Sequence, residues 1–307
     1  MKLASVTFSG RPDQVGGAQI PAKAFQKWCK IFNIECDYLI WENTTPFELN
    51  NYDGIFFCTV PTDDQVVDIN VPYICMIHAE FDIPTNAIHK AISLVVIQKD
   101  YWGYPNELPW YPCVFPEYLL KGDEIWSTNK SGLLYSARIT TWKNATLLAG
   151  LTRYKPFLDF YGPVYISGKA NHDHYQESID LIDPNWTIIS GLFDINHFGK
   201  VRAKHYEKST YWEVFGTPKN RIQIPRFNLS AVEAMKFGLV PIVDKRSTPN
   251  HTNIYTIDIN DIGDYHRIND YRKRMMEILP NSPYGYDAVY KQIQNILEVF
   301  SNECNNI

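Results

Sequence analysis

Residues 132–151 read GLLYSARITTWKNATLLAGL, and within this stretch the pattern changes from strand to helix. The apolar segment 133–137 is typical of a short buried strand, whereas the residues from Lys143 onward are typical of a helix. Arg138 lies in the turn between them. An Arg, a Lys and the free N–H groups of a helix start together suit a diphosphate. Solvated surface charge explains the same two cations equally well.

The segments on either side of this stretch repeat the alternation of apolar strand and helix. Before it, we expect a helix over 18–32 and strands over 2–8, 35–41, 54–60, 73–78 and 92–98. After it, we expect two amphipathic helices in the C-terminal part and strands over 162–168, 185–191 and 238–244. Continuous apolar runs such as IFFCTV are typical of parallel strands covered on both faces. The sequence therefore predicts an α/β protein built from two Rossmann-like halves.

A proline-rich segment lies between the two halves. Pro105, Pro109, Pro112 and Pro116 fall among Tyr and Trp residues, and such a cluster interrupts regular structure. With 307 residues, the chain is long enough for about two domains. We predict one domain over 1–125, a second over 126–285, and a C-terminal helix over 286–307 that can cross back to the first domain.

The composition is that of a globular protein, with 45% hydrophobic and 21% charged residues. No apolar run approaches the ~20 residues that span a bilayer, and the N-terminus resembles a strand, not a signal peptide. We therefore expect a cytoplasmic protein without a membrane partner. The six cysteines show no CxxC spacing, which predicts free thiols. A net charge of −5 argues against indiscriminate nucleic-acid binding.

Gly16 and Gly17 follow the first expected strand and precede the first expected helix. Glycines at this place let a ligand approach the backbone closely, as in nucleotide-binding proteins. The pattern is not GxGxxG, so a dinucleotide site is not supported. A plain tight turn fits the two glycines equally well.

Residues 225–243, PRFNLSAVEAMKFGLVPIV, carry a more specific pattern. They resemble the E-x-F-G-L-x-x-x-E-A-M-x-x-G-x-P-V-I block of retaining GT-B glycosyltransferases of the family-4 type. The residues that match in register are Phe227, Leu229, Glu233, Ala234, Met235, Gly238 and Pro241. The resemblance implies an α/β protein of the GT-B fold, with two Rossmann-like domains facing each other across a cleft. It also implies an acceptor-side domain first and a nucleotide-sugar-binding domain second.

The family resemblance assigns roles to several residues. It implies that Glu233 binds the ribose of the nucleotide and that the neighbouring Asn228, Leu229 and Ser230 help to hold the donor. It also implies that Arg138 and Lys143 neutralise the leaving nucleoside diphosphate. An exposed Glu on an ordinary amphipathic helix is the alternative for Glu233.

One motif position departs from the family block. Pro225 stands where the family has a glutamate that contacts the donor sugar. The identity of the sugar is therefore open, with glucose and a pentose such as arabinose as candidates and Asn228 as a substitute contact.

The segment 138–143, RITTWK, narrows the resemblance to a subgroup. It resembles the R-T-T-T-W-K segment of the DNA α-glucosyltransferases of T-even bacteriophages, which transfer glucose from UDP-glucose to 5-hydroxymethylcytosine in DNA. That subgroup also has a His-Asp pair in its first domain, where this chain has His78, then Ala79 and Glu80. The resemblance implies a role for His78 in orienting sugar or acceptor, whereas a core or capping histidine is the alternative. If the chain is phage-encoded, its compartment is the host bacterial cytoplasm.

A DNA acceptor requires a basic surface and access to a base outside the stack. The most basic, ring-interleaved segment is 197–221, and its candidate DNA contacts are Lys200, Arg202, Lys204 and Trp212, together with Glu80 at the acceptor. Lys23, Lys27 and Lys30 of the first helix either extend such a patch or form a solvated face. A solvated helical face also explains the basic segment.

Three functional hypotheses follow. The first is an enzyme that transfers a sugar from a UDP-sugar to a hydroxymethylated pyrimidine base in phage DNA, with retention and without metal. The second is a GT-B glycosyltransferase that acts on a glycan or lipid-linked acceptor. The third is an inactive GT-B binding protein, which Pro225 and Ala79 suggest but the presence of Arg138, Lys143 and Glu233 opposes. No metal is predicted, because Asp63-Asp64 suits a turn or helix cap and His172-Asp173-His174 lacks further ligands nearby in the sequence. No further cofactor and no obligate protein partner are predicted either.

Overall fold

The computed structural model describes residues 1–8, 19–77, 85–96, 106–110, 114–119, 133–136, 164–168, 187–190, 210–211, 235, 238–243, 257–258 and 267–305. The chain divides into two compact units, Met1–Gly122 with Pro280–Ile307 and Asp123–Leu279. Both contain parallel β-sheet, so the predicted α/β class with two Rossmann-like halves is confirmed. The domain boundaries drawn from the sequence remain a prediction about independently folding domains.

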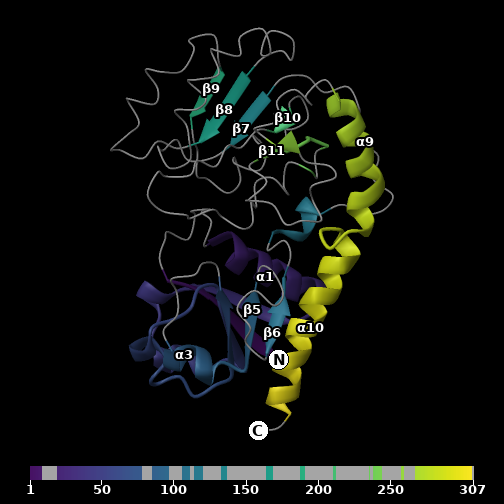
Figure 1. The fold of residues 1–307 in the computed structure, drawn as a ribbon. Helices are drawn as coiled ribbons and strands as arrows, with labels where there is room; N and C mark the ends of the chain where they lie inside the picture. Colours follow the sequence, from purple (N-terminus) through teal and green to yellow (C-terminus); the bar gives the residue numbers. More distant parts are fainter. Residues whose placement is uncertain are drawn as a thin grey trace. The chain divides into compact units, whose positions relative to one another are not determined.

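The first unit is built on a six-stranded parallel sheet (Figure 1). Its strands are β1 (Lys2–Thr7), β2 (Glu35–Ile40), β3 (Gly54–Phe57), β4 (Tyr73–Ile77), β5 (Ser93–Val96) and β6 (Glu107–Pro109), in the order β2-β1-β3-β4-β5-β6. The helices are α1 (Gln19–Ile31), α2 (Pro46–Leu49), α3 (Thr85–Lys90) and α10 (Tyr286–Cys304). Short 3-10 turns cover η1 (Trp41–Asn43), η2 (Asp63–Gln65), η3 (Pro116–Tyr118) and η9 (Leu279–Asn281). The strands expected from the apolar runs are confirmed, with shorter ends.

Both faces of this sheet are buried, as the continuous apolar runs predict. One face of β1 places Ala4 and Val6 in a core that also contains Phe57 and Tyr73. Against the opposite face lies α1, whose Phe25 stacks on Phe56 with ring centroids 4.2 Å apart. These packed rings account for part of the high aromatic content.

Helix α10 belongs to the first unit although it follows the second unit in sequence. Its rings contact α1 and the residue that follows it: the ring centroid of Tyr286 lies 5.4 Å from that of Trp28, and the ring centroid of Tyr290 lies 4.4 Å from that of Phe32. Farther along α10, Phe300 is fully buried over Gly54, where an added Cβ would lie 2.5 Å from the Phe300 Cδ1 atom. The glycine thus lets α10 pack directly on β3.

The second unit contains a four-stranded parallel sheet in the order β10-β7-β8-β9. Its strands are β7 (Leu133–Ser136), β8 (Val164–Gly168), β9 (Thr187–Ser190) and β10 (Thr210–Tyr211). Two further short strands, β11 (Ile242–Val243) and β12 (Ile257–Asp258), pair in parallel, and α9 covers Ile268–Ile278. The strand predicted over 133–137 is confirmed as β7, whereas the helix expected from Lys143 lies outside the described residues.

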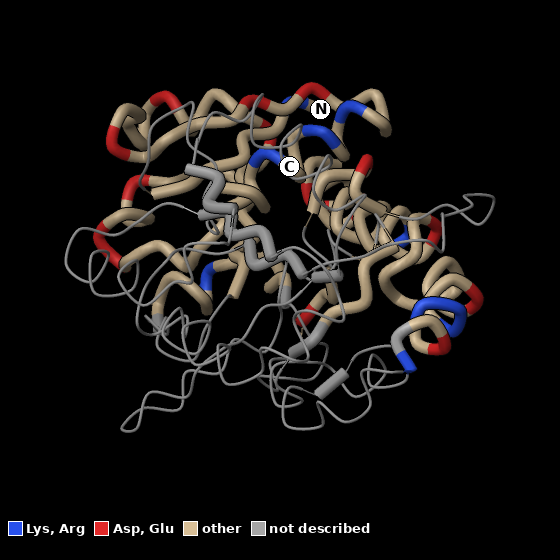
Figure 2. The backbone as a smooth tube through the Cα atoms, turned by 90° about the horizontal axis from the view of Figure 1, so that it is seen from above, with Lys and Arg blue, Asp and Glu red and all other residues tan. Residues whose placement is uncertain are grey.

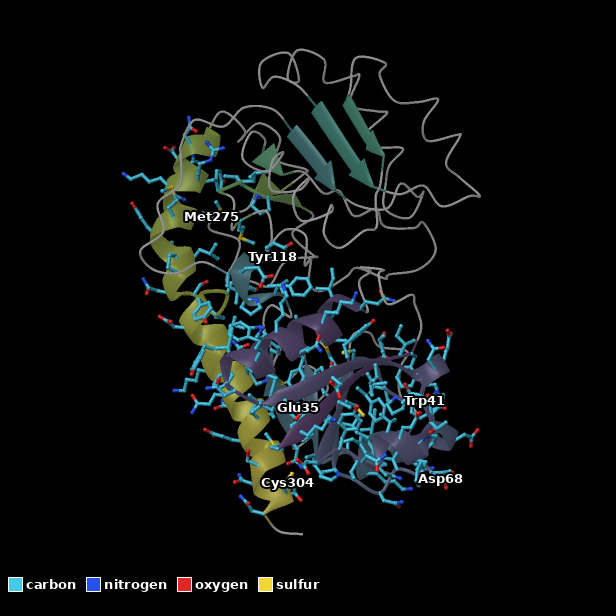
Figure 3. All side chains as sticks on the ribbon, turned by 180° about the vertical axis from the view of Figure 1, so that it is seen from behind. Glu35, Trp41, Asp68, Tyr118, Met275 and Cys304 are labelled. Carbon is cyan, nitrogen blue, oxygen red and sulfur yellow. The ribbon has the colours of Figure 1, made fainter. Side chains whose placement is uncertain are left out.

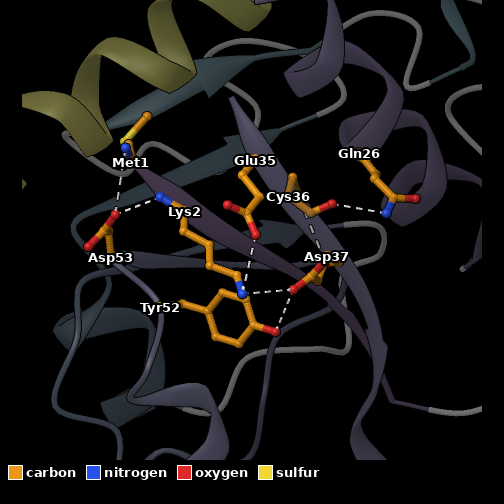
Figure 4. Close-up of polar contacts among 8 residues, drawn as sticks. All are labelled: Met1, Lys2, Gln26, Glu35, Cys36, Asp37, Tyr52 and Asp53. Carbon is orange, nitrogen blue, oxygen red and sulfur yellow. Dashed lines mark hydrogen bonds and ion pairs between the residues drawn. The ribbon is translucent and has the colours of Figure 1, made fainter. Parts of the chain in front are cut away.

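A charged network joins the amino ends of β1 and β2 (Figure 4). The Lys2 ammonium lies 3.3 Å from Glu35 and 3.4 Å from Asp37, and the Tyr52 hydroxyl donates to Asp37 at 2.9 Å. Hydrogen bonds to Glu35 and Asp37 raise the pKa of Lys2, and burial chiefly raises the pKa of Tyr52 to about 12. These charges therefore neutralise one another at the amino edge of the sheet.

The lysines of α1 do not form an open basic stripe. Lys23 is 8% exposed, and its ammonium lies 5.1 Å from the centroid of the Tyr38 ring. Lys27 pairs with Glu117 and also lies over the Phe115 ring. The burial of Lys23 contradicts both alternatives for that residue, whereas Lys27 is exposed and paired with an acidic residue.

Two further observations bear on the composition. The five described cysteines, Cys29, Cys36, Cys58, Cys75 and Cys304, are free thiols, as predicted. Across the described residues, no helix combines the length and the apolar character that crossing a membrane requires.

Candidate functional site

The sequence-predicted site residues all lie outside the described residues. They are Gly16, Gly17, His78, Glu80, Arg138, Lys143, Lys200, Arg202, Lys204, Trp212, Asn228, Leu229, Ser230 and Glu233. The structure does describe the strands and helices that precede or follow many of them in sequence. Their roles therefore remain predictions.

In the first unit, the order of the strands reverses at β1. The chain goes from β1 outward to β2 on one side, and then to β3 on the other side. Ligands of open parallel sheets bind outside the carboxyl ends of the strands at such a reversal. Gly16 and Gly17 lie between the end of β1 at Thr7 and the start of α1 at Gln19. In the sequence, the glycine pair therefore belongs to the connection that follows the strand at this reversal.

The two elements that flank residues 9–18 in sequence, β1 and α1, each have a buried polar side chain. Thr7 is 1% exposed, and within the described part of the chain its Oγ1 has no hydrogen-bond partner. Lys23 is buried in the second turn of α1 above the ring of Tyr38, whose pKa is raised to about 12 chiefly by burial. A buried hydroxyl without a partner is unfavourable unless a ligand or water satisfies it.

The segment that contains His78 and Glu80 runs from β4, which ends at Ile77, to α3, which begins at Thr85. Asp63, the first residue of η2, fixes the start of α3. Its two carboxylate oxygens accept from the Ala87 backbone N–H at 2.8 Å and from Asn86 Nδ2 at 3.0 Å. The Tyr73 hydroxyl donates to the Ala87 carbonyl at 2.8 Å. The sequence interpretation of Asp63 as part of a turn or helix cap is therefore confirmed.

An Asp63→Ala substitution is expected to lower the free energy of unfolding by about 1 kcal/mol, because a helix start loses its capping carboxylate. The measurement is the urea dependence of circular dichroism. Asp64→Ala is the matched control, since Asp64 is the exposed neighbour of Asp63. Equal destabilisation by the two substitutions would contradict the capping role.

In the second unit, the order of the strands reverses at β7. The chain passes from β7 to β8 and β9 on one side, and β10 then pairs with the other side of β7. Arg138 follows the end of β7 by two residues, and Lys143 follows by seven. The two cations therefore belong to the connection that leaves the strand at the reversal point of this sheet.

The end of the motif block is described, and it is tightly packed. Met235 is helical and 2% exposed, and Gly238 has a φ of 73°. The Gly238 N–H donates to the Met235 carbonyl at 2.9 Å, which is the turn expected where a helix ends at a glycine. Leu239 and Val240 then enter the core fully buried. The conformation of Gly238 explains why the block has glycine here.

Arg272 and Asp63 hold this framework and Thr7 is buried within it, and sequence reasoning identified only Asp63. Arg272 comes from α9 and donates from Nε to the Gly238 carbonyl at 3.0 Å. The only available signal for Arg272 was its place in an amphipathic helix, which it shares with the exposed Arg274. Thr7 carried no signal, because a hydroxyl at a strand end is common.

Within the described residues, no three or more His, Cys, Asp and Glu side chains are grouped so that they could hold a metal ion. His172, Asp173 and His174 lie outside these residues.

No family model and no curated protein matches the chain. Solved structures do match over nearly the full length. An α-glucosyltransferase in complex with UDP and a 13-mer DNA containing an HMU base has a TM-score of 0.60 at 11% identity, covering 98% of this chain and 99% of that one. A glycosyltransferase from Rickettsia africae ESF-5 has a TM-score of 0.66 at 13% identity, covering 100% and 99%.

A third match is a glycosyltransferase involved in avilamycin A biosynthesis. Its TM-score is 0.60 at 13% identity, covering 100% of this chain and 98% of that one. At such low identities, the matches establish the fold. Together with the two parallel α/β units, they show that this chain has the GT-B fold of glycosyltransferases.

Proposed function

We propose that the chain is a glycosyltransferase that moves a sugar from a UDP-sugar to a hydroxymethylated pyrimidine base in DNA. The observation that carries this proposal is that the RITTWK segment begins two residues after the end of the described strand β7 in the sequence. Arg138 and Lys143 follow β7, the strand at which the order of the second sheet reverses. The likeness to an α-glucosyltransferase bound to UDP and DNA, over 98% of the chain, supports the same reaction.

Negative charge develops on the diphosphate as the bond to the sugar breaks. A guanidinium and an ammonium beside the phosphates stabilise that charge more in the transition state than in the ground state. Arg138 and Lys143 supply both groups without requiring a metal. In a retaining transfer by front-face attack, the departing phosphate oxygen accepts the proton of the acceptor hydroxyl. His78 and Glu80 would then orient the sugar or the acceptor.

In this proposal, hydrogen-bonding side chains and glycines hold the donor. Glu233 accepts hydrogen bonds from the two ribose hydroxyls, as carboxylates do with vicinal diols. Asn228, Leu229 and Ser230 contribute to the donor site. In the first unit, Gly16 and Gly17 allow close approach of the donor, and Thr7 is a buried hydroxyl at the same end of β1.

Charge is distributed unequally between the two units. The first unit holds nine Lys and Arg against seventeen Asp and Glu, a formal charge of −8. The second holds twenty against seventeen, a formal charge of +3, and contains Lys200, Arg202 and Lys204 with Trp212. Figure 2 marks the charged residues of the described part. DNA phosphates are therefore expected to contact the second unit, because the first repels them.

The test is transfer from UDP-glucose and UDP-arabinose to a duplex that contains 5-hydroxymethylcytosine. Mass spectrometry of the digested nucleosides is expected to show a hexose or pentose added to the modified base, together with released UDP. The matched control is the same duplex with unmodified cytosine, which lacks the accepting hydroxyl. No transfer to any hydroxymethylated DNA would overturn the DNA acceptor.

A glycan or lipid-linked acceptor is the second candidate. The −8 charge of the first unit and the likeness to the avilamycin biosynthetic glycosyltransferase favour it. UDP release that depends on a neutral glycan and not on DNA would support this candidate. Added salt distinguishes the two further, since DNA binding weakens steeply with ionic strength and binding of a neutral glycan does not.

A further inference from the structure

Arg272 is a buried cation in the second unit that the proposed reaction does not use. Its side chain is 1% exposed, among the largest fully buried side chains of the described residues. A guanidinium stays protonated, so its burial is unfavourable unless acceptors surround it. Helix α9 also buries Met275 on the next turn (Figure 3). Lys273 and Arg274 of the same helix are exposed. Arg272 therefore lies on the buried face of α9, together with Met275.

The contacts of Arg272 join two elements that are distant in sequence. Its Nε donates to the Gly238 carbonyl at 3.0 Å, and its Nη1 donates to Asn269 Oδ1 at 3.1 Å. Asn269 lies one turn earlier on α9, and its hydrogen bond orients the guanidinium toward the Gly238 carbonyl. Gly238 follows the helical Met235 by three residues, and its positive φ and its hydrogen bond to the Met235 carbonyl are typical of a helix end. A cation is favourable at this end, because the last carbonyls of a helix carry partial negative charge.

The Gly238 turn is joined closely to the predicted nucleotide-binding residue. Glu233 precedes Met235 by two residues and Gly238 by five. Met235 is 2% exposed, and Leu239 and Val240 are fully buried, so the turn has little freedom to move. Arg272 therefore contacts the motif block five residues from Glu233 in the sequence.

We propose that Arg272 is a positioning residue for the nucleotide: through the Gly238 carbonyl it fixes the motif block so that Glu233 can bind the ribose of UDP. This inference rests on the proposed function. It predicts that loss of Arg272 weakens UDP binding through Glu233. The effect falls mainly on KM for the donor and less on kcat, because the ribose is remote from the reacting bond.

The experiment measures UDP binding to the full chain by isothermal titration calorimetry. Arg272→Met is expected to raise the Kd for UDP about 10-fold, as misplacement of a binding group does. Arg274→Met, an exposed guanidinium on the same helix, is the matched control and should leave the Kd unchanged. A double-mutant cycle with Glu233→Gln then tests the route, since Arg272→Met should have little further effect in that background.

Several outcomes would overturn the inference. One is a folded Arg272→Met protein whose Kd stays within about 2-fold of the wild type, which is below the coupling expected of residues that act together. Another is a full effect of Arg272→Met in the Glu233→Gln background. If Arg272→Met does not fold, the Kd for UDP is measured on Arg272→Lys instead, because lysine keeps the charge but lacks the planar Nε–H donor. Unchanged UDP affinity in folded Arg272→Lys overturns the inference, and weakened affinity supports it.

The same titrations separate this inference from the proposed function. If the wild type binds UDP and Arg272→Met binds it equally well, the inference alone fails. If the wild type does not bind UDP, the proposed function fails, and the inference fails with it.

Discussion

An Arg138→Ala variant is expected to turn over about 10²-fold to 10³-fold more slowly than the wild type, the loss seen when a charge-stabilising donor is removed. Lys143→Ala should have an effect of similar size, because both cations act on the same departing diphosphate. The measurement is UDP release under saturating donor and acceptor. Arg138→Lys should recover part of the rate, since lysine keeps the charge but not the two-pronged contact.

Lys273→Ala is the control for Arg138→Ala, because Lys273 is an exposed cation of the same unit. Its turnover should equal that of the wild type. Addition of EDTA should also leave wild-type turnover unchanged if the two cations neutralise the leaving group. Near-normal turnover of folded Arg138→Ala and Lys143→Ala would show that other residues stabilise the diphosphate.

Phe300→Ala is expected to have the largest effect on stability, about 3–5 kcal/mol, because it removes a fully buried ring from the contact of α10 with β3. That is a large part of the total stability of a typical domain. Urea denaturation followed by circular dichroism measures the change. Asn295→Ala is the control on the same helix, since Asn295 is exposed and its replacement should change stability by at most about 0.5 kcal/mol.

Gly54→Ala tests the same contact from the other side. The added Cβ would lie 2.5 Å from the Phe300 Cδ1 atom, so the ring or the strand must move. A cost of about 1–3 kcal/mol is expected for such overpacking. In a Phe300→Ala background the cost should be smaller, because the clashing ring is gone. Strict additivity of the two substitutions would contradict direct packing.

The regular elements were predictable because their signals are local. Apolar runs such as that of β3 identify buried parallel strands, and the spacing of Val289, Ile293, Ile296 and Phe300 identifies the buried face of α10. The order of the strands was not predictable. It depends on which strand pairs with β1 and β7, and the sequence of neither strand contains that information.

Asp63 and Arg272 show the same difference between local sequence signals and contacts that depend on the fold. Asp63 was predictable as a cap from its place after Pro61, but its partner Ala87 is 24 residues away in sequence. Arg272 and Arg274 are the same residue type two positions apart, and only the packing of α9 buries the first. Pattern matching identified Glu233 and Arg138, whose roles remain predictions, but the side chains that hold the framework need coordinates.

The contact between Phe300 and Gly54 has a consequence for synthesis of the protein. A ribosome delivers β3 early and α10 only after the whole second unit has been made. Domains usually fold as they emerge, but the first unit must wait with an apolar face uncovered until α10 arrives. A premature stop codon just before α10 would therefore leave every predicted site residue in the chain. The truncated protein would still be prone to aggregation and proteolysis, because the apolar face of the first unit stays uncovered.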